Sequence, residues 1–168
     1  MNILEILKSI LQGIVQGITE WLPISSTGHM LLLDQFLHMT VSDDPVRNQA
    51  FFDLFKVVIQ FGSILAVIVL YFHKLNPFSG KKSPLERKDT WKLWGKVLIA
   101  SIPAGVIGIA FDDLIDGVLS SPYVIAATLI IYGLLFIVLE SLHRKPKVNG
   151  FGELNIPTVL LIGVCQML

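Results

Sequence analysis

The residues with the clearest chemical potential form one short cluster, residues 16–29, with the sequence QGITEWLPISSTGH. Glu20 is a hard oxygen ligand suited to Mg²⁺ or Ca²⁺, and Gln16 lies one helical turn earlier on the same face. Three hydroxyl residues open the next helical run: Ser25, Ser26 and Thr27. Hydroxyls at a helix start, together with backbone N–H groups, attract anions such as phosphate. With His29 as a candidate general base or nucleophile, the cluster outlines a site for a metal ion and an anion.

The composition places these residues in a membrane protein. Of 168 residues, 53% are hydrophobic and 15% are charged, against about 45–50% and about 25% in ordinary soluble domains. The 13 basic and 13 acidic side chains cancel, so no charge excess indicates a nucleic-acid partner. The single Cys165 excludes an intrachain disulfide scaffold and a cysteine zinc site. Partners are therefore expected in the lipid bilayer.

Three stretches are apolar over about 20 residues, the length that a helix needs to cross a bilayer. They are residues 51–72, 91–111 and 118–139. The connection 73–96 is rich in lysine and arginine, which predicts a cytoplasmic location. Residues 112–117 carry no basic side chain and residues 33–50 carry only Arg47, so both segments are predicted to face outward.

Residues 1–38 are predicted to form a re-entrant helical hairpin. Polar residues recur there at steps of three or four and therefore share one helix face: Glu5, Lys8, Gln12, Gln16 and Glu20. Such a stripe normally faces a bundle interior or a water-filled cavity. Pro23 interrupts the helix before a second apolar run from about residue 29 to residue 37. A helix broken at membrane depth is typical of sites in transporters and intramembrane enzymes.

The cluster also has a structural interpretation. Ser-Ser-Thr-Gly after a proline is typical of ordinary helix capping, and a lone histidine near a helix start is often structural. Glu20 is harder to explain in this way, because an ionisable residue at membrane depth usually marks a functional site. The combination therefore favours a site.

Other polar motifs are interpreted as structural. Residues 112–116, DDLID, have the DDxxD spelling of a Mg²⁺–diphosphate motif, but their place in a short outward loop favours a solvated acidic turn. Two small-residue motifs are typical of close helix packing: Gly13-x-x-x-Gly17 and Ser101-x-x-x-Gly105. Gln60 and Ser63, inside the first span, are expected to form hydrogen bonds between helices, with a place at the site as the alternative.

A faint repeat and a longer motif point to a known family. Residues 13–18 and 163–168 share a glycine followed three positions later by glutamine, and three spans separate them, which suggests inverted repeats. Residues 16–29 match (E/Q)GxTExLPxSSTGH position for position, the first motif of the undecaprenyl-diphosphatases, also called bacitracin-resistance proteins. Residues 55–66 and 102–104 resemble further stretches of that family.

This resemblance implies an all-α integral membrane enzyme built from two inverted repeats, each with a re-entrant hairpin. The implied reaction is the hydrolysis of undecaprenyl diphosphate to undecaprenyl phosphate and inorganic phosphate. The implied site opens to the outer face of the bacterial plasma membrane. The reaction recycles the lipid carrier of peptidoglycan synthesis and confers bacitracin resistance.

The resemblance also implies roles for individual residues. Gln16 and Glu20 correspond to the site of a divalent metal, Mg²⁺ or Ca²⁺. The phosphate-contacting hydroxyls correspond to Ser25, Ser26 and Thr27. Glu20, Ser26 and His29 are the implied catalytic residues, and the attacking group is either Ser26 or His29. Many members have glutamate where this chain has Gln16, which predicts weaker metal binding.

The family's second motif, PGxSRSGxT, follows the glutamine that corresponds to Gln166, and this sequence ends two residues later. Residues 156–168 are therefore expected to begin a second repeat that lacks its arginine and remaining spans. We expect the 168-residue chain to be inactive by itself. With its polar stripe uncovered, it is also expected to be unstable or to associate with itself in the bilayer.

Two other classes share some of these features. A lipid transporter or flippase would use the same inverted architecture but would need no nucleophile. A prenyl-transferring enzyme of the DDxxD type would need a second carboxylate cluster, which the sequence lacks.

Overall fold

A computed structural model describes residues 3–119, 121–142, 148 and 150–166, and only the backbone of residues 112–116 and 118–119. Within these ranges all regular structure is helical and no strand occurs. The chain forms two compact units, one of residues 1–67 with 118–142 and one of residues 68–117 with 143–168. The predicted all-α class is confirmed.

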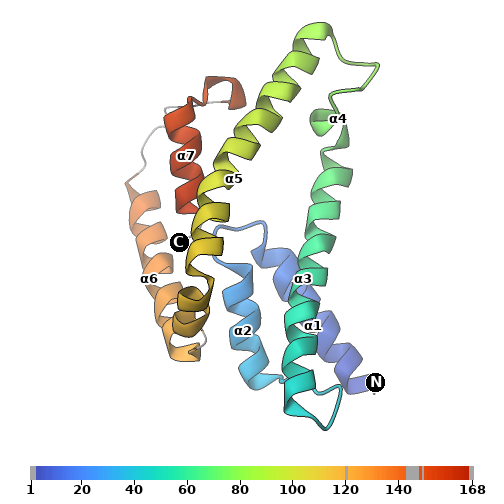
Figure 1. The fold of residues 1–168 in the computed structure, drawn as a ribbon, viewed down its shortest axis with the longest axis vertical. Coiled ribbons are helices and arrows are strands. Elements are labelled where there is room, and N and C mark those ends of the chain that lie inside the picture. Colours follow the sequence, from blue (N-terminus) through green and yellow to red (C-terminus); the bar gives the residue numbers. More distant parts are fainter. Residues whose placement is uncertain (1–2, 120, 143–147, 149, 167–168) are drawn as a thin grey trace. The chain divides into compact units, whose positions relative to one another are not determined.

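The first unit contains the N-terminal hairpin and two long helices (Figure 1). Its helices are α1 (Ile3–Thr19), α2 (Ser26–Phe36), most of α3 (Pro45–Leu70) and α6 (Pro122–Ser141). α2 packs against both α1 and α6. Met30 of α2 also forms an apolar cluster with Met39 and with Phe52 of α3. α2 is therefore the element that joins the other helices of this unit.

The second unit is arranged around the longest helix of the described chain. Its helices are α4 (Phe72–Leu75), α5 (Pro84–Leu119), the 3₁₀ helix η1 (Phe151–Glu153) and α7 (Ile156–Cys165). Lys96 of α5 donates to the carbonyl oxygen of Phe151 (2.6 Å). Gly163 of α7 lies so close to α5 that a Cβ there would come 2.1 Å from the carbonyl oxygen of Ala100. Side-chain and backbone contacts thus hold η1 and α7 to α5.

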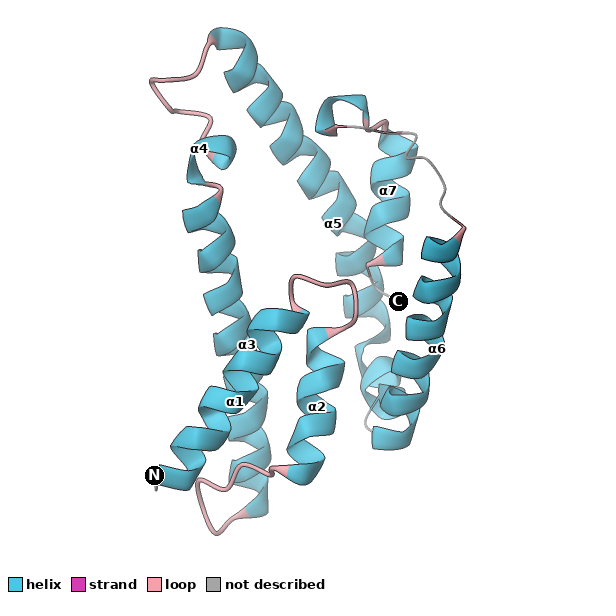
Figure 2. Ribbon diagram, turned by 180° about the vertical axis from the view of Figure 1, so that it is seen from behind, coloured by secondary structure: helices cyan, strands magenta, loops and turns pink. Residues whose placement is uncertain are grey.

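The two helices of the hairpin lie side by side, and their outer ends are tied together (Figure 2). Glu5 Oε2, in the first turn of α1, accepts a hydrogen bond from the N–H of Thr40, just after α2 (2.9 Å). Lys8 donates to Glu5 (2.8 Å) and to the carbonyl oxygen of His38 (2.6 Å). At 1.5 Å per residue the helices are about 25 Å and about 16 Å long, shorter than a hydrocarbon core of about 30 Å.

The polar stripe of α1 faces the protein interior. The exposed fractions of Glu5, Gln12 and Gln16 are 4%, 0% and 2%, whereas Ile14 on the same helix is half exposed. Gln12 Nε2 donates to the carbonyl oxygen of Met30 (3.4 Å), and Gln12 Oε1 is buried without a partner among the described residues. α1 therefore turns its polar face to α2 and its apolar face outward, as expected for a helix surrounded by lipid.

Three helices of the described chain are long and apolar enough to cross a membrane. They are Pro45–Leu70, Pro84–Phe111 and Pro122–Ser141, and almost no residue of their most apolar windows is buried inside the protein. Apolar surface of this extent is unfavourable in water and favourable in lipid. Each of the three predicted spans thus falls on a long apolar helix, and the chain is a membrane protein.

One predicted loop is helical instead. Residues 112–117, expected to form a short acidic turn, continue α5 as far as Leu119 after a break at Phe111 (φ −126°, ψ 20°). Apolar residues at positions 111, 114, 115 and 118 recur at helical spacing, and this pattern outweighs the acidic residues that suggested a turn. The third span begins at Pro122 rather than at residue 118, because proline favours the first helical positions.

Candidate active site

The predicted site residues gather where α1 ends and α2 begins. Residues 20–25 form the turn, and Pro23 within it lacks the N–H that a continuing helix needs. Ser25 is the last residue of the turn. Its φ of 60° is the one positive φ of a non-glycine residue among those described. Its side chain accepts a hydrogen bond from the N–H of Gly28 (3.3 Å), so Ser25 is the N-cap of α2. The capping interpretation is confirmed for this hydroxyl.

The Glu20 carboxylate connects the two sides of the turn. Its Oε2 atom accepts hydrogen bonds from the Ser26 hydroxyl (2.5 Å) and from Gln16 Nε2 (3.2 Å). Glu20 is exposed, and its Oε1 atom accepts no hydrogen bond from the described residues. A carboxylate that holds a hydroxyl in this way can take its proton when the oxygen reacts. Glu20 and Ser26 thus have the geometry of a base and a nucleophile.

Two side chains of α3 hold the site in place. Ser63 donates to Gln16 Oε1 (3.0 Å), which leaves the amide N–H of Gln16 to face Glu20. Gln60 Nε2 donates to Thr27 Oγ1 (3.2 Å). Both alternatives considered for Gln60 and Ser63 therefore hold, because each joins two helices and each contacts a predicted site residue.

His29 has one ring nitrogen engaged in its own helix. Its Nδ1 atom lies 2.8 Å from the carbonyl oxygen of Ser25. A carbonyl oxygen only accepts hydrogen bonds, so Nδ1 carries the proton and Nε2 of the neutral ring keeps a lone pair. The side chain is partly exposed. His29 can therefore accept a proton or attack an electrophile through Nε2.

The first turn of α2 also offers backbone donors. The first N–H groups of a helix have no partner inside it. The side chain of Ser25 accepts a hydrogen bond from the N–H of Gly28. The N–H groups of Ser26 and Thr27 have no acceptor among the described residues. These two N–H groups, the dipole of α2 and the adjacent hydroxyls can together bind an anion.

Gly28 has a packing role that the sequence did not predict. A Cβ there would lie 3.2 Å from Ser25 Oγ, 3.4 Å from Leu129 and 3.5 Å from Ile125. α6 therefore packs directly against this position of α2, and the tightest contact of an added Cβ would be with the capping hydroxyl of Ser25.

A hollow of about 440 Å³ lies beside the site in the first unit. Its lining includes Gly13, Gly17 and Gln16 of α1 together with Gly62 and Ser63 of α3. A Cβ at Gly13 or Gly17 would meet no described atom within 4 Å. No described helix packs closely at this motif, where the two glycines leave the surface of α1 open.

Two cations of the first unit, Lys8 and Arg47, are bound to partners away from the Glu20–Ser26 pair. Lys8 is bound to Glu5 and to His38. These contacts lie at the end of the hairpin opposite the turn, here called the foot of the hairpin, about 18 Å along the helix axis from Glu20. Arg47, in the first turn of α3, pairs with Asp44 (3.7 Å). Neither of these two cations contacts Glu20 or Ser26 in the described structure.

Two buried polar residues that no sequence motif marked, Asp34 and Asn48, hold the foot of the hairpin. Asp34 accepts from the N–H of Met39 (3.3 Å) and lies 3.0 Å from His38 Nδ1. Asn48 accepts from the N–H of Ser42 and donates to its carbonyl oxygen, both at 2.9 Å. The only signal for Asp34 is its i,i+4 spacing to a histidine, which is common on exposed helices.

The donor set for a divalent cation is small. Among the described residues, no three histidine, cysteine, aspartate or glutamate side chains lie close enough to share a metal ion. Two side-chain oxygen atoms beside Ser26 can coordinate a cation. They are Glu20 Oε1 and Gln16 Oε1, which keeps one lone pair after accepting the hydrogen bond from Ser63. Mg²⁺ is commonly held by one or two carboxylates, water and substrate phosphates. The residues present fit that type of site and do not fit an all-protein cage.

Comparison with known proteins gives one consistent result. The family described as bacitracin resistance protein BacA matches residues 9–168. An undecaprenyl-diphosphatase 1 of Clostridioides difficile is 49% identical over 99% of this chain and 59% of its own length. Undecaprenyl-diphosphatases of Enterococcus faecalis and Acetivibrio thermocellus are 47% and 50% identical, over 96% and 98% of this chain and 57% and 59% of their own lengths.

The chain thus spans about three fifths of the length of the curated relatives it matches. No solved structure matches it. The matched region includes the whole turn between α1 and α2, with every residue of the predicted site.

Proposed function

This chain belongs to the bacitracin resistance protein BacA family, and on that premise we propose that its hairpin turn forms part of the active site of an undecaprenyl-diphosphatase. The observation that carries the proposal is the hydrogen bond from Ser26 to Glu20 across the turn (2.5 Å). A transporter could also use free helix N–H groups to bind an anion, but it would need no nucleophile paired with a base. The reaction supplies undecaprenyl phosphate, the lipid carrier that peptidoglycan synthesis reuses.

The proposed site lies in the plasma membrane and opens to its outer face. The foot of the hairpin is joined to segments with few basic residues, which favours an outward location. Both hairpin helices are shorter than the hydrocarbon core, so the turn reaches into the bilayer without crossing it. A lipid diphosphate with its chain in the outer leaflet can meet such a turn from the membrane.

In the proposed reaction Ser26 attacks the terminal phosphorus of the diphosphate. The Ser26 O–H proton passes to Glu20 as the new O–P bond forms, and the bond from that phosphorus to the bridging oxygen breaks. The bridging oxygen leaves with undecaprenyl phosphate. Water then attacks the phosphorus of the phosphoserine, the bond from phosphorus to Ser26 Oγ breaks, and Glu20 returns its proton to that oxygen as inorganic phosphate is released. His29 Nε2 is placed to take a proton from that water.

The first turn of α2 and its hydroxyl residues bind the phosphate oxygens in this proposal. Three donors stabilise the negative charge that develops on these oxygens: the N–H groups of Ser26 and Thr27 and the Thr27 hydroxyl. The helix fixes the two N–H groups, and the hydrogen bond from Gln60 fixes the hydroxyl. Glu20 and Gln16 would hold a divalent cation, which when bound offsets phosphate charge. Because Gln16 is neutral, weak metal binding is expected, and Mg²⁺ or Ca²⁺ should be needed in excess.

The central test is phosphate release from undecaprenyl diphosphate by the complete protein that contains this chain. Glu20→Gln keeps the size of the side chain and removes the base, so turnover should fall by at least about 10²-fold. The matched control is Asp53→Asn, which removes an exposed carboxylate of α3 that pairs with Lys56. More than about a tenth of normal activity in Glu20→Gln, a loss under about 1.4 kcal/mol, would remove Glu20 from the mechanism.

The attacking group is identified by the chemistry of the trapped intermediate. We expect rapid acid quenching to recover an acid-stable phosphoserine, absent from Ser26→Ala and present in His29→Ala. An acid-labile phosphorylated histidine that survives in Ser26→Ala would instead assign the attack to His29. Such a result would contradict the Ser26 role while leaving the diphosphatase activity in place.

A further inference from the structure

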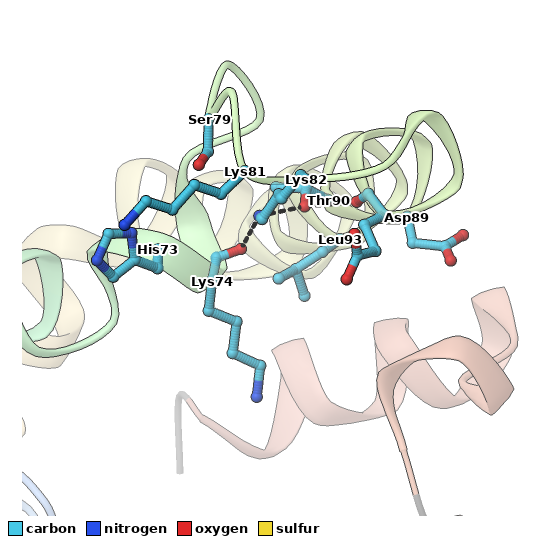
Figure 3. A pocket seen from close by; sticks show the side chains of 9 residues that line it. His73, Lys74, Ser79, Lys81, Lys82, Asp89, Thr90 and Leu93 are labelled. Carbon is cyan, nitrogen blue, oxygen red and sulfur yellow. Dashed lines mark hydrogen bonds between the residues drawn. The ribbon is translucent and has the colours of Figure 1, made fainter.

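The second unit contains a basic hollow that the proposed reaction does not use. It has a volume of about 590 Å³ and lies between the segment after α3 and the start of α5, with His73, Ser79, Lys81 and Lys82 in its lining (Figure 3). We propose that this hollow binds the headgroup of an anionic phospholipid in the leaflet opposite the active site.

Two lysines supply donors to the hollow in different ways. Lys82 is fixed, because its Nζ donates to the carbonyl oxygen of Lys74 (2.8 Å) and to Thr90 Oγ1 (2.7 Å). An ammonium has three N–H bonds, so one donor remains for a ligand. Lys81 extends toward His73 in Figure 3 and makes no hydrogen bond or ion pair with the described residues. A fixed cation beside a free one is a suitable arrangement for holding a phosphate group.

The acidic residues of the hollow are occupied elsewhere. Glu86 accepts from the N–H of Ser83 (2.7 Å), which caps the start of α5. Asp89 is paired with Lys92 (3.1 Å), a residue that does not line the hollow. Neither carboxylate forms an ion pair with Lys81 or Lys82 among the described residues, although Glu86 interacts with Lys82 through its charge. The carboxylates therefore offset the positive charge of the two lysines only in part.

Aromatic side chains place the hollow at the level of lipid headgroups. Five are exposed near the ends of the apolar helices in this unit: Tyr71, Phe72, Phe78, Trp91 and Trp94. Phe78 packs edge to face on Trp91, with ring centroids 5.7 Å apart, and Trp94 Nε1 donates to the carbonyl oxygen of Leu75 (2.9 Å). Exposed tryptophan and tyrosine are enriched at membrane–water interfaces. A ligand in the hollow would therefore come from the bilayer surface.

The charge of the whole segment favours an anionic lipid over a zwitterionic one. Residues 73–96 contain seven lysine and arginine residues and two acidic residues. A juxtamembrane basic cluster of this kind binds anionic headgroups. The choline of phosphatidylcholine would bring a positive charge toward Lys81, whereas phosphatidylglycerol offers its phosphate without one. We therefore expect the hollow to select phosphatidylglycerol.

The test measures bound lipid and does not depend on enzyme activity. The detergent-purified chain is equilibrated with equimolar phosphatidylglycerol and phosphatidylcholine, and the lipid retained on the protein is counted by native mass spectrometry. We expect phosphatidylglycerol to be retained with a preference of about tenfold, and Lys81→Gln to reduce it to near equality. Lys81 makes no hydrogen bond to described residues, so this variant should keep the wild-type melting midpoint.

A matched control separates a built site from general attraction to a basic segment. Arg87→Gln with Lys88→Gln removes two charges from the same segment without touching the hollow, and should leave the preference unchanged. Equal losses in this control and in Lys81→Gln would overturn the proposal. So would displacement of phosphatidylglycerol by an equal concentration of inorganic phosphate, because the ligand would then be free phosphate rather than a lipid.

Discussion

At the scale of single residues, the orientation of one amide links the membrane-spanning helix α3 to the proposed base. Ser63 occupies the oxygen of the Gln16 amide, and this contact directs the nitrogen to Glu20. An amide can bind in two orientations that differ by exchange of its oxygen and nitrogen. With the opposite orientation, Gln16 Oε1 would face Glu20 Oε2, and two acceptor oxygens cannot form a hydrogen bond. Ser63 is therefore a positioning residue for Glu20.

Removing the Ser63 hydroxyl should weaken this alignment without removing any group that touches substrate. One neutral hydrogen bond contributes about 1 kcal/mol, so Ser63→Ala should lower kcat/KM for undecaprenyl diphosphate about fivefold in the complete protein. Ser63→Thr, which keeps a hydroxyl, should restore most of the loss. Ser101→Ala is the control, because among the described residues that hydroxyl bonds only to the carbonyl oxygen of Val97 in its own helix (3.0 Å). Equal effects of Ser63→Ala and Ser101→Ala would contradict the positioning role.

At the scale of helices, the two units use glycine in opposite ways. In the first unit Gly13 and Gly17 leave the surface of α1 open beside the site. In the second unit Gly163 brings α7 against the backbone of α5. A Cβ added at Gly163 would lie only 2.1 Å from the carbonyl oxygen of Ala100. Backbone atoms cannot move aside as a side chain can, so only glycine fits there. The position of α7 on α5 therefore depends on this one residue.

Gly163→Ala should separate α7 from α5 and destabilise the second unit by about 1–3 kcal/mol, the usual cost of overpacking. Gly105→Ala, in α5, is the matched control, since an added Cβ meets no described atom within 4 Å. It should be neutral or stabilise by up to about 1 kcal/mol, because alanine favours a helix. The midpoint of unfolding in detergent, followed by helical circular dichroism, distinguishes the two. An unchanged midpoint in Gly163→Ala would show that α7 does not pack on α5.

At the scale of the whole molecule, the distribution of charge relative to the membrane sets the two proposed sites apart. The basic hollow lies in residues 73–93, which are rich in lysine. The foot of the hairpin is joined to residues 33–50, which contain one basic residue, Arg47. Because one membrane span, α3, connects them, these segments should lie on opposite sides of the bilayer.

Labelling with a membrane-impermeant thiol reagent tests this arrangement. In a Cys165→Ser background, Asp43→Cys should be modified in intact cells, and Lys88→Cys should be modified only after the membrane is opened. Both positions are exposed in the structure, so lack of access would reflect the membrane rather than burial. Modification of Lys88→Cys but not of Asp43→Cys in intact cells would reverse the topology and place the hairpin turn on the cytoplasmic side.

Local properties of the sequence determined the elements and the type of chemistry. The lengths of the apolar stretches predicted the three long helices, and Pro23 predicted the end of α1 before a second helix. The motif at residues 16–29 placed the acid, hydroxyls and imidazole at one turn, because residues that flank a tight turn are close whatever the rest of the fold does. The helical structure of residues 112–117 was missed because acidic residues masked a weak apolar periodicity.

Contacts between distant segments were decided by tertiary structure alone. Ser63 reaches Gln16 across 47 positions, and Gln60 reaches Thr27 across 33. Polar residues of α3 recur at helical spacing and mark one face of the helix: Asp53, Lys56, Gln60 and Ser63. That pattern does not show which helices the face meets. Gly163 likewise differs from other glycines only through its packing against Ala100. The sequence can mark the polar face of a membrane helix, but only packing in three dimensions selects the partners of that face.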